Sequence, residues 1–124
     1  MQTSARRYKS DITPLVGEFD SYEDFEQRLL SIEPKTWIDK SEAEERAAAI
    51  ENGNVPDQLV RHVGAIAEDF HDAGLSRFVT YDSEGQVNGL SYDRLGVALI
   101  PVVARLRDRV VALESAVADL SNKQ

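Results

Sequence analysis

Residues 99–120 read LIPVVARLRDRVVALESAVADL, and the regular pattern of this stretch decides the fold. Apolar side chains return in it at alternating steps of four and three residues, as they do along the seam of a coiled coil. The seam residues are Leu99, Val103, Leu106, Val110, Leu113, Val117 and Leu120. A helix from about Tyr92 to Ser121 is roughly 45 Å long, which is more than so small a domain covers with its own mass. We therefore expect the helix to associate with further copies of the chain, rather than to pack only on its own head.

The residues beside the seam favour parallel helices. With Val103 at position a of the heptad, Arg109 falls at g and Glu114 at e, so these two side chains can meet between parallel neighbours. Valine at a with leucine at d favours a dimer over a trimer, and three heptads do not separate the two. Pro101 removes a helical hydrogen bond, and we expect a kink or an interruption near residues 97–101.

The chain before the seam mixes helical and strand-like segments. Helical spacing predicts helices over residues 21–32 and 42–52, the first capped by Ser21 and the second by a capping box of Ser41 and Glu44. Strand-like residues occupy 35–39, 59–67, 77–81 and 86–92, with a short helix at 68–74 and a hairpin turn at 82–85. The sequence thus predicts an α+β fold: a small mixed head over residues 1–98 and a coiled-coil stalk over residues 99–124.

Composition excludes several classes of protein. Fourteen Lys and Arg against 22 Asp and Glu give a net charge of −8, the wrong sign for coating nucleic acid or anionic lipid, so we expect neither as a partner. The absence of cysteine rules out disulfides and thiolate metal sites. No apolar run approaches the roughly 18 residues that span a bilayer, and the first residues lack the apolar core of a signal peptide. We expect a soluble protein that is not exported.

The remaining polar residues give weak signals for a site. His62 and His71 lie near Glu68, Asp69 and Asp72, but no pair has the spacing of metal ligands, so we expect no metal and no cofactor. His62 is interpreted as a neutral structural histidine and Trp37 as a core residue. The acidic residues of SYEDFE and EAEERAAAIE are interpreted as solvated helix faces.

Four segments, in order along the chain, resemble the peptidase S74 domain, the C-terminal intramolecular chaperone of endosialidases and other phage tail fibres and tailspikes. They are SARRYKSDI at residues 4–12, LLSIEPKTWIDK at 29–40, VGAIAEDF at 63–70 and YDRL at 92–95. The resemblance implies a homotrimer that promotes assembly of a phage fibre protein, either fused upstream or separate. It places the protein in the host cytoplasm during phage assembly or in the virion tail.

The same resemblance implies that the domain cuts itself off at Thr3-Ser4. Ser4 is then the nucleophile and Lys9 the general base, with Arg6 and Arg7 lowering the pKa of that lysine. A separation of five residues does not bring two side chains to one face of a strand or helix, so the segment must turn. On the residues alone, the simpler interpretation is a loop serine and a solvated lysine. The alternative function is a trimerising structural or adaptor protein of the phage tail without catalysis.

Overall fold

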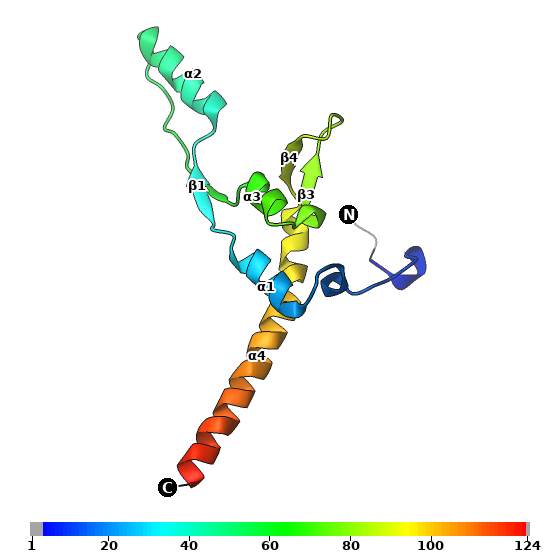
Figure 1. Cartoon of the computed structure of the whole chain (residues 1–124). Helices are drawn as coiled ribbons and strands as arrows, with labels where there is room; N and C mark the ends of the chain where they lie inside the picture. The colour runs from blue at the N-terminus through cyan, green and yellow to red at the C-terminus, as the bar shows by residue number, and fades with distance from the viewer. Residues whose placement is uncertain (1–3, 124) are drawn as a thin grey trace. The chain divides into compact units, whose positions relative to one another are not determined.

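The computed structural model describes residues 4–123 (Figure 1). These residues divide into two compact units, one made of residues 4–28 and 91–123 and the other of Leu29–Leu90. Helices and two small antiparallel sheets are both present, so the predicted mixture of helix and strand is confirmed. The division into a head and a stalk at residue 98 stays a prediction.

The C-terminal helix dominates the unit formed by residues 4–28 and 91–123. Helix α4, Tyr92–Asn122, has 31 residues, which confirms the predicted long helix (Figure 1). It continues through Pro101, so the expected interruption near residues 97–101 is wrong, while the alternative of a kink stays a prediction. The hydrogen bonds on either side of the proline are enough to keep the helix continuous. Among residues 4–123, no helix combines the length and the apolar character needed to cross a membrane.

Helix α1, Tyr22–Leu30, packs its first residues against α4. Ser21 caps it as predicted, since the Asp24 backbone N–H donates to Ser21 Oγ at 3.0 Å. The buried apolar side chains of this unit are Phe25, Ala98 and Val102. Before α1 the chain forms two short 3₁₀ helices, η1 (Arg6–Tyr8) and η2 (Leu15–Glu18).

The unit Leu29–Leu90 contains the two sheets. Strand β1, Lys35–Trp37, pairs antiparallel with β2, His62–Gly64, and Trp37 lies opposite His62. The predicted strand over residues 59–67 is therefore too long. Its partner strand offers only three residues for pairing, and the next helix already begins at Ala67.

Helix α2, Lys40–Glu51, follows β1 and has no buried residue. The predicted capping box is wrong, because Asp39 and not Ser41 is the N-cap residue, and no side chain caps the helix. The predicted end of the helix is confirmed. Gly53 adopts a φ of 78°, and the Asn54 N–H donates to the carbonyl of Ala49 at 2.8 Å.

Strands β3, Val79–Tyr81, and β4, Val87–Leu90, form a hairpin, and helix α3, Ala67–Asp72, packs on it. The short 3₁₀ helix η3, Ser76–Phe78, connects α3 to β3. Asp82 closes the predicted turn, since its carboxylate accepts from the N–H groups of Glu84 and Gln86 at 2.9 Å. The buried apolar residues of this unit are Leu29, Phe70, Leu75, Phe78 and Val79.

Candidate functional site

The seam of α4 is the largest candidate site. Each of its seven side chains, from Leu99 to Leu120, is between 40% and 65% exposed. Hydrophobic residues of this size usually lie inside a protein, and a continuous exposed row of them is typical of a surface that binds a protein, a membrane or a ligand. The predicted seam is thus present on one helix and uncovered by the described part of the chain.

Helix α1 lies against a different face of α4. Its contacts fall on Val102, Arg105 and Arg109, each one residue before a seam position. Consecutive residues of an α-helix are about 100° apart around its axis. The face that binds α1 therefore lies beside the seam and leaves it accessible.

Further apolar side chains widen the seam near the start of the helix. Val97 and Ile100 are exposed. A shallow hollow lies among Gly96, Leu99, Ile100, Val103, Ala104 and Arg107. Since Gly96 and Ala104 have little or no side chain, this part of α4 can approach a neighbouring helix closely.

Ion pairs from two arginines of α4, Arg105 and Arg109, hold α1 to α4 in this unit. Arg105 Nη2 donates to Glu23 Oε1 at 2.9 Å, and its Nε lies 3.4 Å from Glu26 Oε2. Glu26 is buried, with its side chain 11% exposed, so the prediction of a solvated face is wrong for this residue. Arg109, which we expect to meet Glu114 of a second chain, lies 4.0 Å from Glu26 and is mostly exposed.

The Ser4 and Lys9 segment turns, as the resemblance requires. The 3₁₀ helix η1 lies between them, and its hydrogen bonds run from the N–H of Tyr8 to the carbonyl of Ala5 and from the N–H of Lys9 to that of Arg6. Both Ser4 and Lys9 are exposed. Their roles as nucleophile and base stay predictions, and Thr3 of the predicted cut lies outside the described residues.

The arginines of this segment have contacts of their own. Arg7 Nη2 donates to Tyr8 Oη at 2.8 Å, and its guanidinium lies 4.7 Å from the centre of the Tyr8 ring. This stacking fixes the charge of Arg7 beside Tyr8. The predicted effect of Arg6 and Arg7 on Lys9 stays a prediction.

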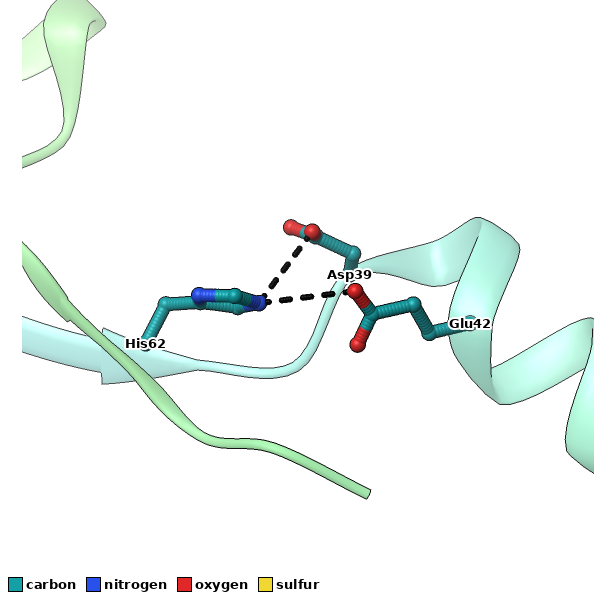
Figure 2. Close-up of side chains that lie close together, drawn as sticks. All are labelled: Asp39, Glu42 and His62. Carbon is teal, nitrogen blue, oxygen red and sulfur yellow. Dashed lines mark ion pairs between the residues drawn. The ribbon is translucent and has the colours of Figure 1, made fainter. Parts of the chain in front are cut away.

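The structure separates the two histidines. His71 Nδ1 lies 2.7 Å from Tyr81 Oη, a contact between α3 and β3. His62 instead contacts Asp39 and Glu42, which lie at the start of α2. The two carboxylates approach Nε2 of its imidazole ring (Figure 2). Sequence reasoning grouped His62 with Glu68, Asp69 and Asp72 and missed this cluster, because it depends on the β1–β2 pairing. The one available signal is that Asp39 and Glu42 are three residues apart at a helix start.

Trp37 is half-buried and takes part in the same cluster. Its indole Nε1 donates to Asp39 Oδ1 at 3.2 Å, and its ring centre lies 6.4 Å from that of His62. The prediction of a core residue is therefore right only in part, since Trp37 also orients a polar group.

Comparison with known proteins does not assign the chain to a family. The chain matches no family model and no curated protein. The likeness to the peptidase S74 domain therefore rests on the four quoted segments and stays a prediction.

Proposed function

We propose that this chain is a trimerising assembly module of the intramolecular-chaperone type, which promotes assembly of a phage tail fibre or tailspike protein. Three copies associate in parallel through the seam of α4. The observation that carries the proposal is the continuous row of exposed leucines and valines from Leu99 to Leu120.

The energetics favour covering this row. Full burial of a valine or leucine side chain stabilises a structure by about 1.5–3 kcal/mol. The seven seam side chains are 40–65% exposed, so covering them offers about half of this, roughly 5–11 kcal/mol per chain, which is comparable to the cost of about 4–15 kcal/mol for each association. The parallel arrangement is supported by the heptad positions of Arg109 and Glu114, and the choice of three chains over two by the resemblance.

A seam substitution and a matched control test the association. Leu113 lies on the seam, and Val111, two residues earlier, is exposed to a similar degree but lies off it. Leu113→Asp places a charge in the interface and should give monomers in sedimentation equilibrium. Wild type and Val111→Asp should both sediment at three times 13.8 kDa. Monomeric wild type contradicts the proposal.

Self-cleavage forms a second part of the proposal. In an isolated chain Ser4 and Lys9 are both exposed to solvent. A lysine acts as a general base when desolvation or nearby positive charge favours its neutral form. We infer that neighbouring chains supply this environment, so that cleavage belongs to the assembled trimer.

The test is the intact mass of the chain expressed behind an upstream trimeric fibre segment. Wild type should be cut before Ser4, and Ser4→Ala should abolish the cut. Lys9→Arg keeps the positive charge but removes the base, since arginine does not lose its proton, so it should also stay uncut. Ser10→Ala, an exposed serine nearby, is the matched control and should be cut like wild type.

The competing function is the adaptor without catalysis, and the same experiment separates the two. Wild type that remains intact while sedimenting as a trimer favours the adaptor. Leu113→Asp that is cut as well as wild type contradicts the dependence of cleavage on assembly.

A further inference from the structure

The side chains of Asp39, Glu42 and His62 converge on one point in the unit Leu29–Leu90 (Figure 2). His62 Nε2 lies 3.3 Å from Asp39 Oδ2 and 3.6 Å from Glu42 Oε1. One ligand atom from each residue lies within 4.8 Å of the other two. Imidazole nitrogen and carboxylate oxygen are both ordinary ligands of divalent metal ions.

Three further observations distinguish this cluster from a simple surface ion pair. His62 Nε2 exposes less than 1 Å² to solvent and makes no hydrogen bond, although two carboxylates approach it. A buried polar atom without a hydrogen bond is costly and calls for an explanation. Asp39 stands at the N-cap of α2 yet does not cap it, so its carboxylate is turned away from its usual hydrogen bonds and toward His62.

The third observation concerns Trp37. Its Nε1–H donates to Asp39 Oδ1, which leaves Oδ2, the oxygen nearer to His62, available. Metal-binding carboxylates are commonly oriented in this way by a hydrogen bond to the other oxygen. Trp37 lies opposite His62 in the register of β1 and β2, so the indole that donates this hydrogen bond and the imidazole are neighbours across the two strands.

We propose that Asp39, Glu42 and His62 form a binding site for a divalent transition-metal ion, for which Zn²⁺ is the best match. Zn–N and Zn–O bonds are about 2.0–2.1 Å, so ligands at tetrahedral angles lie about 3.3 Å apart. The separations of 3.3 and 3.6 Å around His62 Nε2 agree with that spacing, and the two carboxylate oxygens, which lie within 4.8 Å of each other, would be drawn together by a bound ion. Water completes the fourth position. Mg²⁺ and Ca²⁺ prefer all-oxygen sites and should bind poorly.

A metal ion here ties the start of α2 to β2. Asp39 is the N-cap residue of α2 and Glu42 lies in its first turn, while His62 belongs to the strand that pairs with β1. The cross-link adds to a strand pair of three residues and to two side-chain hydrogen bonds, from Arg46 to the carbonyl of Asp57 and from Arg61 to Thr36. Metal binding should therefore raise the thermal stability of this unit.

The experiment is calorimetric titration of the full, untagged chain with Zn²⁺ after treatment with a chelator, with Mg²⁺ as the comparison ion. Wild type should bind one Zn²⁺ per chain and show a higher melting temperature with Zn²⁺. His62→Gln and Glu42→Gln should lose both effects. Trp37→Phe, which removes only the orienting hydrogen bond, should weaken binding about tenfold.

Two matched controls make the result specific. His71→Gln removes the other histidine, and Glu44→Gln removes an exposed carboxylate of α2 that is not part of the cluster. Both should bind like wild type. Circular dichroism without metal must show that every variant is folded. Absence of Zn²⁺ binding by wild type overturns the proposal, as does equal binding by folded His62→Gln or equal loss in His71→Gln.

Discussion

Glu26 is a buried acidic residue of α1, and it forms an ion pair with Arg105. Its side chain is 11% exposed, while that of Arg105 is 27% exposed, so the pair is only partly screened by water. Removing Glu26 leaves Arg105 paired with Glu23, which is far more exposed to water, so the more buried part of the charge compensation is lost. Glu23 bonds the same arginine at 2.9 Å but is 71% exposed.

These two residues provide a first prediction. Glu26→Gln should lower the free energy of unfolding by about 1–3 kcal/mol. Glu23→Gln, the matched control, should change it by less than about 1 kcal/mol, because exposed pairs contribute little. Urea denaturation at one fixed chain concentration measures both. Equal effects of the two substitutions contradict the role assigned to burial.

The contacts of single side chains could be predicted from the sequence only where the partner is close in the chain. Ser21 was identified as a cap because its partner, Asp24, lies three residues away. Glu26 was interpreted as a solvated residue, and His62 was grouped with Glu68, Asp69 and Asp72, because the true partners of both lie far along the chain. Arg105 reaches Glu26 only once α1 has packed on α4, and Asp39 reaches His62 only through the register of β1 and β2.

The hairpin of β3 and β4 depends on the left-handed backbone conformation of one residue in its turn, Gly85. Gly85 has a φ of 81°, a left-handed conformation that costs other residues about 1–2 kcal/mol. No atom lies within 4 Å of the position that a Cβ would occupy there, so the cost of a side chain is that of the backbone alone. Gly17 is equally open but does not have a positive φ.

Alanine substitutions at the two glycines should therefore act in opposite directions. Gly85→Ala should destabilise the chain by about 1 kcal/mol. Gly17→Ala should leave stability unchanged or raise it by up to about 1 kcal/mol, because it restricts the unfolded chain. Thermal denaturation followed by circular dichroism measures both shifts. A Gly85→Ala variant as stable as Gly17→Ala shows that the turn does not need the left-handed residue.

The elements were predicted well where a local pattern is enough. The heptads gave α4 nearly to its ends, and Asp82 with Gly85 gave the hairpin. Strand length was wrong over residues 59–67, since pairing stops where β1 ends and not where strand-like residues end. Pro101 was expected to kink or interrupt α4, and no interruption occurs, because the loss of one hydrogen bond is small beside the ladder of a 31-residue helix.

For the whole molecule, the exposed area is larger than a folded monomer requires. The chain exposes 9937 Å². A compact monomer of 13.8 kDa exposes about 6,600 Å², and two separate units of half that mass about 8,000 Å² together. If other copies cover the seam of α4, as proposed above, the association buries part of this surplus.

Folding should therefore depend on assembly, which gives the last prediction. The unit containing α4 buries only Phe25, Ala98 and Val102 as apolar side chains among its described residues, too few to hold a helix of 31 residues in place alone. If unfolding separates the chains, the melting temperature must rise with protein concentration. A tenfold higher concentration raises the free energy needed to unfold and dissociate the oligomer at the former midpoint. The increase is about 2.7 kcal/mol per oligomer for a trimer and about 1.4 kcal/mol for a dimer.

Differential scanning calorimetry over a hundredfold range of concentration distinguishes these cases. Wild type and Val111→Asp should show the concentration dependence of a trimer. Leu113→Asp, which breaks the seam, should melt at a lower temperature that does not change with concentration. A wild-type melting temperature independent of concentration means that each chain folds alone, and the exposed seam of α4 then needs a partner other than its own copies. If the melting temperature changes with concentration as calculated for a dimer, the heptad pattern of valine and leucine predicts the number of chains correctly and the resemblance does not.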